Sequence, residues 1–338
     1  QTNDGGFIIA GFILDNEINI RNIFLLKTDM NGVEEWFYTY NGLGNWEGYS
    51  VDQTDDGGYI VVGNSWSEES NRNTFLLKTN SIGDFEWNRV FGDADVSLGY
   101  AIQETSDEGF IITGYLRALG SDDFNLFLIK ADSEGNEEWY QEYGGDGFDR
   151  GYDVQICSDG GFVIGGATNS FGIGNWDYYL IKTDSLGIEE WSSTFGGQNS
   201  DFGFSVHETY DGGFVLGGTT DSFGNGNGDN WIIKTDTNGV EEWNFSIGGI
   251  SSDWGNSLIQ TSNGRYLSAG GTGSFGNGEE DIWIIYFGHL DGCTDQNAIN
   301  FDPFSTIDDG SCYYLSDIDQ HFQQNWQGIP LNPMGIYV

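Results

Sequence analysis

The chain repeats itself about every 52 residues, and this period constrains its fold more than any other feature. A turn triplet of the Asp-Gly-Gly type precedes an aromatic residue at Phe7, Tyr59, Phe110, Phe162, Phe214 and Tyr266. A tryptophan keeps the same spacing at Trp36, Trp87, Trp139, Trp191 and Trp243. So does a lysine, at Lys27, Lys78, Lys130, Lys182 and Lys234. A fixed period of this size indicates an array of similar units that share one core.

Each repeat predicts four short strands, which the second repeat places at 48–53, 58–63, 74–79 and 85–91. Asp, Asn and Gly fill the tight turns after the first and third strands. Apolar runs in the second and third strands predict that both their faces are covered. Four-stranded sheets covered on both faces and repeated along the chain predict an all-β fold, a β-propeller over residues 1–288.

The number of blades stays open between six and seven. The pattern predicts 22 strands, because the first repeat lacks its first strand and the last repeat lacks its fourth. Both missing strands would lie just before Thr2, and about 20 further residues there would close a six-bladed ring. One more upstream repeat would instead make seven blades. We therefore expect the chain to be a mature or truncated piece of a longer protein.

Charge excludes several classes of partner. The chain has 11 basic and 53 acidic residues, a formal net charge of −42. Nucleic acids and anionic membranes need clustered Lys and Arg, so we expect neither as a partner. We also expect no direct membrane insertion, because the sequence has no apolar run near the roughly 20 residues that span a bilayer.

The repeated tryptophan and lysine predict structural roles. The tryptophan follows a turn of the form Asp-x-x-Gly, as from Asp184 to Gly187 before Trp191. This pattern resembles the tryptophan-docking motif of quinoprotein propellers, which implies an indole packed between neighbouring blades. We expect no organic cofactor, because basic residues are scarce and no vicinal cysteine pair exists. Acidic residues just before each tryptophan predict an ion pair with the lysine across the third and fourth strands.

The loops after the second and fourth strands are longer and more varied than the tight turns, which makes their face the candidate binding face. Carboxylates recur there, with tryptophans nearby: Asp177, Asp229 and Asp281 begin third strands, Asp149, Asp201 and Asp253 begin first strands, and Trp46, Trp176 and Trp254 accompany them. Such a set could bind cations or stack on sugars. The alternative is that the Asp side chains cap turns by accepting local N–H groups.

No motif singles out a catalytic site. A pair of carboxylates could hydrolyse a glycoside, but the repeat offers many acids and marks none of them as a pair. The histidines, His207, His289 and His321, have no metal-site or triad spacing. We therefore predict a protein without catalytic residues.

The repeat ends at Gly288, and a cysteine-bracketed loop follows at 289–314. Cys293 and Cys312 enclose an acidic segment, which predicts a disulfide and hence an oxidising, extracellular setting. Residues 315–338 read as a linker and the start of a further β domain.

Residues 292–313 resemble a calcium-binding module related to thrombospondin type 3 repeats, found in secreted proteins of Bacteroidetes. The matching residues are Gly292, Cys293, Asp295, Asn300, Asp308, Asp309, Gly310, Ser311 and Cys312. Oxygen ligands of this kind suit Ca²⁺. The expected ligands are Asp295, Asn297, Asn300, Asp302, Asp308 and Asp309. The alternative is a disulfide-closed acidic linker that holds no metal.

The repeats resemble the β-propeller repeats of secreted bacterial surface proteins, which are commonly exported by the type 9 secretion route. The resemblance implies an extracellular or cell-surface adhesion module that binds a polysaccharide or another surface protein without catalysis. Two rivals remain: a carbohydrate-active enzyme, glycosidase or lyase, on the loop face, and a structural spacer in a surface filament.

Overall fold

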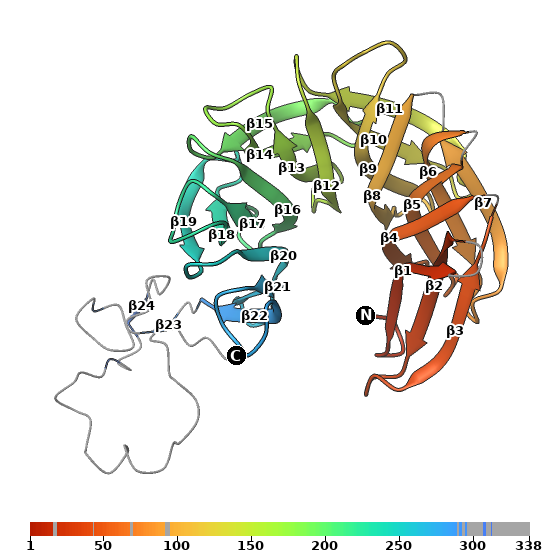
Figure 1. Ribbon diagram of the computed structural model, residues 1–338, viewed down its shortest axis with the longest axis horizontal. Coiled ribbons are helices and arrows are strands. Elements are labelled where there is room, and N and C mark those ends of the chain that lie inside the picture. The colour runs from red at the N-terminus through yellow and green to blue at the C-terminus, as the bar shows by residue number, and fades with distance from the viewer. Residues whose placement is uncertain are drawn as a thin grey trace. The chain divides into compact units, whose positions relative to one another are not determined.

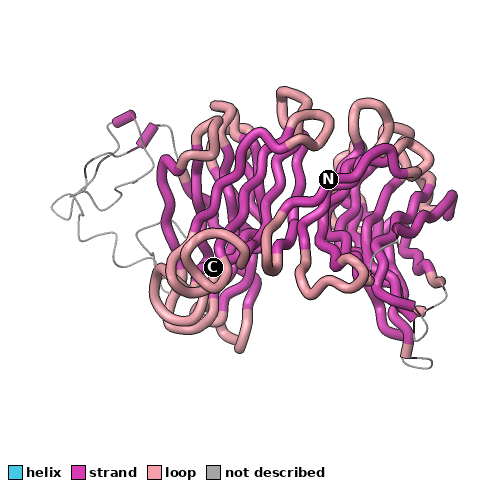
Figure 2. The backbone as a smooth tube through the Cα atoms, turned by 90° about the horizontal axis from the view of Figure 1, so that it is seen from above, coloured by secondary structure: helices cyan, strands magenta, loops and turns pink. Residues whose placement is uncertain are grey.

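The computed structural model describes residues 1–15, 19–42, 44–67, 70–91, 95–288, 291–292, 295, 307–308 and 312. Within these residues every regular element is a β-strand (Figure 2). None of the described residues belongs to a helix of the length and apolarity needed to span a membrane. The expected domain at 315–338 lies outside the described residues, as do Cys293, Asn297, Asn300, Asp302 and Asp309, so the predicted disulfide and calcium ligands stay predictions.

The first of two compact units spans Gln1–Gly203 and holds four antiparallel sheets, which we call blades 1 to 4 (Figure 1). In each blade the strands are hydrogen-bonded in chain order. Blade 1 has β1 (Phe7–Asp15), β2 (Ile20–Thr28) and β3 (Glu34–Tyr40); blade 2 has β4 (Asn45–Gln53), β5 (Tyr59–Ser67), β6 (Ser70–Thr79) and β7 (Phe85–Phe91); blade 3 has β8 (Val96–Glu104), β9 (Phe110–Arg117), β10 (Asn125–Ala131) and β11 (Glu137–Tyr143); blade 4 has β12 (Asp149–Ile156), β13 (Phe162–Thr168), β14 (Asp177–Thr183) and β15 (Glu189–Phe195).

The second unit, Phe204–Val338, holds blades 5 and 6. Blade 5 has β16 (Asp201–Glu208), whose first residues belong to the first unit, β17 (Phe214–Thr220), β18 (Asp229–Thr235) and β19 (Glu241–Ile247); blade 6 has β20 (Asp253–Gln260), β21 (Tyr266–Thr272) and β22 (Asp281–Phe287). Two short strands, β23 (Asp291–Gly292) and β24 (Ile307–Asp308), pair in parallel and join the two ends of the acidic loop.

The predicted strand pattern is confirmed. Among the described residues β1 to β22 form six blades, of which the first lacks an inner strand and the sixth lacks an outer strand. The two middle strands of a blade are covered on both faces: in β14 every residue is buried. Sheets of this kind, repeated along the chain, form a six-bladed β-propeller fold.

The repeated tryptophan packs between neighbouring blades, as the docking motif implied. The Trp139 ring of blade 3 lies 6.0 Å from the Phe162 ring of blade 4, and Trp36 lies 5.7 Å from Tyr59 in blade 2. A glycine leaves room for the indoles of Trp36, Trp87 and Trp139: at Gly187, with φ +74°, a Cβ would stand 2.6 Å from Trp139. A side chain at this turn would therefore separate the two blades.

A β-bulge interrupts the inner strand just after its glycine. In blade 2 the pairing shifts between Gly48 and Ser50, and the same shift occurs in blades 3, 4 and 6. One residue is left out of the pairing in each of these strands: Tyr49, Tyr100, Tyr152 and Asn256. Because a bulge re-aims the side chain it carries, this residue does not follow the alternation of the strand.

Candidate functional site

We call the end of a blade with the two tight turns its turn end, and the other its loop end. At the turn end each repeated lysine is buried and bonded to two carboxylates. Lys182 Nζ lies 2.7 Å from Asp159 Oδ2 and 3.1 Å from Glu190 Oε2, and it donates to the Thr183 carbonyl at 2.9 Å. The same arrangement holds Lys27, Lys78, Lys130 and Lys234. The predicted ion pair across the third and fourth strands is confirmed, with a second carboxylate from the turn.

In these clusters the charge of the buried lysine is balanced by its carboxylate partners. Burial alone would lower the pKa of Lys182, but hydrogen bonds to Asp159 and Glu190 outweigh it and raise the pKa. Burial would likewise raise the pKa of Asp159, whereas Lys182 holds it below its usual value. A lysine with a raised pKa keeps its proton at neutral pH, so it stabilises the fold and is not available as a base.

The predicted loop-end carboxylates lie in the interior. Asp149, Asp201 and Asp253 have no exposed surface, Asp177 and Asp229 are almost fully buried, and Asp281 is half-buried. Each accepts hydrogen bonds from the loop before it: Asp177 Oδ2 accepts the N–H groups of Ile173 at 3.0 Å and Gly174 at 3.1 Å. In these contacts the carboxylates cap loops, which was the alternative interpretation of the sequence.

Some of these carboxylates are incompletely satisfied. The Oδ1 atoms of Asp149, Asp177 and Asp229 are buried and have no hydrogen-bond partner among the described residues. A Cβ on Gly196 would stand 1.9 Å from Asp177 Oδ1 and 2.9 Å from Asp201 Oδ2, so these two oxygens lie close together. Burial, and to a lesser extent the charge of Asp201, raises the pKa of Asp177.

No metal-binding group accompanies these acids. Across the part of the chain that the structure describes, no three His, Cys, Asp or Glu side chains gather in a geometry that could hold a metal ion. The carboxylates meet in twos, as Asp229 and Asp253 do on either side of Gly248. Cation binding at the loop face therefore stays a prediction without a third carboxylate in support.

The three predicted tryptophans pack against different neighbours. Trp46 lies against Phe75, with ring centroids 4.7 Å apart. Trp254 belongs to the second unit, where it covers Gly271. Trp176 lies between Phe148, at 6.3 Å, and Phe202, at 5.4 Å.

Trp176 belongs to a continuous run of rings in the first unit, which we call the aromatic tract. Its inner part comes from the bulges: the Tyr100 ring lies 5.0 Å from Tyr49, 5.4 Å from Tyr152 and 5.6 Å from Tyr115. These contacts span blades 2, 3 and 4. Burial raises the pKa of Tyr100 above its usual range, and it raises that of Tyr49 to about 12, so both hydroxyls stay protonated.

The outer part of the tract lies at the loop end. Tyr115 contacts Phe124 at 5.8 Å, and Phe124 stacks on Phe148 at 5.2 Å. Backbone bridges from Phe124 to Phe148 and from Trp176 to Ser200 hold these loop ends together. The full tract comprises Tyr49, Tyr100, Tyr115, Phe124, Phe148, Tyr152, Trp176 and Phe202.

The sequence prediction missed the tyrosines of this tract, although a signal was present. The residue after the repeated glycine of the inner strand is aromatic in four consecutive repeats: Tyr49, Tyr100, Tyr152 and Phe204. A β-bulge shifts the alternation of inward and outward side chains along a strand. The direction of the bulged residue therefore cannot be predicted from that alternation in the sequence.

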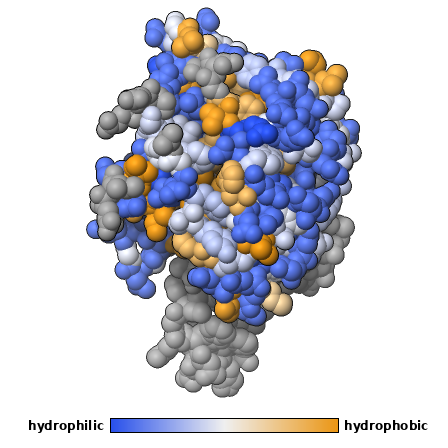
Figure 3. All heavy atoms as spheres, turned by 90° about the vertical axis from the view of Figure 1, so that its right-hand side faces the viewer, coloured by the Kyte–Doolittle hydropathy of each residue, from blue (hydrophilic) through white to orange (hydrophobic). Residues whose placement is uncertain are grey.

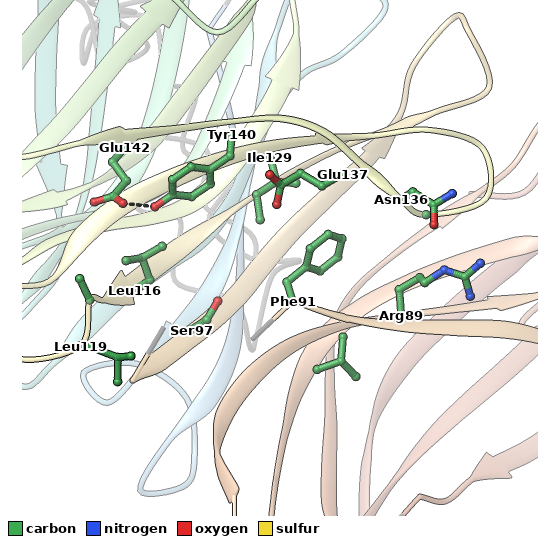
Figure 4. A pocket seen from close by; sticks show the side chains of 13 residues that line it. Arg89, Phe91, Ser97, Leu116, Leu119, Ile129, Asn136, Glu137, Tyr140 and Glu142 are labelled. Carbon is green, nitrogen blue, oxygen red and sulfur yellow. Dashed lines mark hydrogen bonds between the residues drawn. The ribbon is translucent and has the colours of Figure 1, made fainter. Parts of the chain in front are cut away.

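A groove of about 620 Å³ lies between blades 2 and 3 (Figure 4). Phe91, Leu116 and Tyr140 make its apolar wall, and Arg89 and Glu142 are polar groups of its lining. The Tyr140 hydroxyl donates to Glu142, which occupies that carboxylate. Figure 3 shows one face of the molecule, on which apolar side chains form small separate patches in a mainly hydrophilic surface. The tract is the longer array of contiguous rings, so we take it as the candidate site.

Comparisons with known proteins show only distant structural likeness. No protein-family model and no curated protein matches the chain. The propeller domain of the Trilobed protease from Pyrococcus furiosus is 10% identical, with 84% of this chain and 78% of that chain covered and a TM-score of 0.45. Sqt1 from Chaetomium thermophilum is 11% identical, with 83% and 65% covered and a TM-score of 0.47.

An endo-1,4-beta-xylanase from Bacteroides thetaiotaomicron is 12% identical, with 70% of this chain and 89% of that chain covered and a TM-score of 0.40. A fold hosts many activities, so the function has to be argued from the side chains of this chain alone.

Proposed function

We propose that this chain is a non-catalytic binding module for an extracellular polysaccharide, and that the aromatic tract is its contact surface. The observation that carries the proposal is the continuity of the tract across blades 2, 3 and 4 and as far as Phe202 at the start of β16. Parts of it face solvent, with Tyr49 42% and Phe148 36% exposed. Aromatic rings combine a flat apolar face with little conformational freedom, so they bind the apolar face of a sugar ring at a low entropic cost.

The rigidity of the tract supports the same role. The bulge tyrosines stand on the inner strands of three sheets, and the Tyr49 hydroxyl is fixed by a 2.7 Å hydrogen bond to Glu47 Oε2. Glu47 is buried and paired with Arg21. A ligand that stacks on such rings meets a surface that is already ordered.

The main rival is a glycosidase, which needs two carboxylates on either side of a sugar. Glu47 is committed to Tyr49 and Arg21. The Asp177 and Asp201 pair is buried and caps loops. These contacts favour binding over hydrolysis at the tract.

The proposal includes the setting that the sequence suggested. An extracellular location, a partner that is a polysaccharide and not a nucleic acid, and calcium in the acidic loop all belong to it. β23 and β24 bring Asp308 beside Gly292, which is consistent with a closed loop at that place. If calcium is bound there, the carboxylates of Asp295 and Asp308 are among the oxygens expected to hold it.

The test is a polysaccharide binding screen with product analysis, run with calcium and again with EDTA. On any polymer that binds, Tyr49→Ala should weaken affinity about tenfold, because it removes one stacking ring. Tyr38→Ala is the matched control: its ring is 44% exposed but lies beside Trp36 on the outer strand of blade 1, outside the tract.

Equal loss in both variants would remove the tract as the site. Detection of cleavage products would show that the chain is a carbohydrate-active enzyme and not a non-catalytic binding module. No binding to any polymer would favour the structural spacer.

A further inference from the structure

Arg150 is a basic residue at a position that is apolar in three of the other four repeats that contain it. The same position, one residue before the repeated glycine of the inner strand, holds Glu47, Leu98, Phe202 and Trp254 in the other repeats. It immediately follows Asp149 on β12, at the loop end of blade 4. No other repeat has a cation at this position, so the fold does not require the arginine.

The guanidinium of Arg150 lies inside the aromatic tract. Its central carbon is 4.7 Å from the Trp176 ring centroid and 5.0 Å from that of Tyr115. Nη1 donates to the Tyr152 hydroxyl at 3.2 Å. Cation–π attraction accounts for the stacking, but it leaves the N–H groups in the plane of the guanidinium unused.

Those N–H groups lack an acceptor. Nε is buried without a hydrogen-bond partner, and among the described residues no carboxylate pairs with Arg150. By contrast, Arg21 pairs with Glu47 and Arg117 with Asp95. Arg72, Arg89 and Arg265 likewise have no carboxylate partner among the described residues, so what distinguishes Arg150 is its place inside the aromatic tract.

The free groups form one edge. With Nη1 committed to Tyr152, the Nε and Nη2 N–H groups remain, and they point in parallel. This edge matches the two oxygens of a carboxylate, which accept both hydrogen bonds at once. Of the two, Nε is buried without an acceptor, which is unfavourable and which a ligand acceptor at this edge would relieve.

We propose that the aromatic tract binds an acidic glycan, and that the carboxylate of a uronic acid accepts hydrogen bonds from Arg150. This inference rests on the proposed function and adds the charge of the ligand to it. The net charge of −42 repels such a polymer at long range. Salt screens that repulsion but screens the half-buried contact much less, so affinity should hold or rise between low and physiological ionic strength.

The experiment measures binding of the full chain to polygalacturonate and alginate, and to the same polymers after methyl esterification. The acidic forms should bind at least about tenfold more tightly than the esters. Arg150→Gln should abolish that difference, whereas Arg150→Lys should keep part of it because lysine offers a point charge without the planar edge. A sulfated neutral polymer is a third ligand that separates a carboxylate from a sulfate.

Arg89→Gln is the matched control. Arg89 is also half-buried and stacks on a ring, 5.2 Å from Trp87, but lies outside the tract. Equal binding of acid and ester, unchanged in Arg150→Gln, would overturn the inference and leave the proposed function intact. Preference for the sulfated polymer would contradict the proposal that Arg150 binds a carboxylate. Absence of binding to any polymer, neutral ones included, would overturn both.

Discussion

The two ends of a blade treat buried charge in opposite ways. At the turn end, blades 1 to 5 carry the same lysine cluster, in which a buried cation meets two carboxylates. At the loop end, Asp177 and Asp229 each keep an oxygen without a partner among the described residues, where Arg150 likewise has no carboxylate partner. The buried charges at the turn end are thus paired with opposite charges, and those at the loop end are not. The paired charges recur in five blades and stabilise the fold, whereas the unpaired ones differ from blade to blade.

Blade 6 shows how closely the members of a cluster depend on one another. At the places of the repeated Asp and Lys it has Asn263 and Tyr286, and Asn263 Nδ2 donates to the Tyr286 hydroxyl at 2.7 Å. Both charges are replaced together, and a neutral hydrogen bond takes their place. A cluster that changes only as a whole is a structural unit.

The largest effect is expected from Lys182→Ala. The change leaves Asp159 and Glu190 without their cation and the Thr183 carbonyl without its donor. We expect a loss of about 3 kcal/mol in the free energy of unfolding, at the lower end of the range for broken buried pairs because both acids are partly exposed. Denaturant unfolding measures it.

Glu190→Gln is the control for that prediction. Its side chain is 48% exposed and Asp159 remains beside Lys182. The loss should stay below about 1 kcal/mol. Equal losses in the two variants would mean that the negative charge of the outer strand, and not the buried lysine, holds the turn end.

The loop end predicts the opposite sign for Asp177→Asn. An amide keeps the loop acceptor, removes the buried charge and offers a donor toward Asp201, so the variant should be about 1 kcal/mol more stable at pH 7. The raised pKa of Asp177 means that the native state holds this proton more tightly than the unfolded chain. As pH falls through that raised pKa, wild type becomes neutral as well, so the gain should shrink.

Asp159→Asn tests the same chemistry at the turn end. The pKa of Asp159 is lowered, so its contribution to stability is present above the ordinary value for Asp and is lost as pH falls through the lowered value. The variant should therefore be less stable than wild type at pH 7, and the difference should vanish in acid. A loss of stability at pH 7 in both variants would show that Asp177 has a partner, such as a cation, that compensates its charge.

The sequence predicted the contacts at the turn end of the blades better than those at the loop end. The lysine, the acid before the tryptophan and the turn all recur, so Lys182 and Glu190 could be paired from the period alone. The strand count and the missing strands followed from the same period. At the loop end the sequence identified Asp177 and Trp176 but predicted neither the burial of the first nor the rings around the second.

The reason is physical. Burial of Asp177 depends on how Gly196 and Asp201 close over it, and these residues belong to a loop and to a different sheet. The tract depends on bulges, which change where a side chain points without changing the period. Repetition thus reveals contacts that every blade makes, whereas contacts made once, such as those of Arg150, become visible only in three dimensions.

The smallest effect concerns a single departure at the turn end. The first turn of blade 3 places Glu108 at φ 64°, where blades 2 and 4 have Gly57 at 82° and Gly160 at 83°. A left-handed conformation costs a residue with a Cβ about 1 kcal/mol or more, whereas glycine adopts it freely. The Glu108 N–H donates to the Thr105 carbonyl at 2.9 Å, as Gly57 does to Thr54 at 2.8 Å, so the turn itself is unchanged.

Glu108→Gly should therefore stabilise the chain by roughly 0.5–1 kcal/mol, less than the full conformational cost because glycine adds freedom to the unfolded state. Gly160→Ala, its mirror change in blade 4, should destabilise by a similar amount, and thermal unfolding of the two variants measures both. If Glu108→Gly instead destabilises, the exposed Glu108 side chain makes a favourable interaction that its turn geometry does not require. The turn end would then, like the loop end, contain a residue retained for a reason other than the stability of its blade.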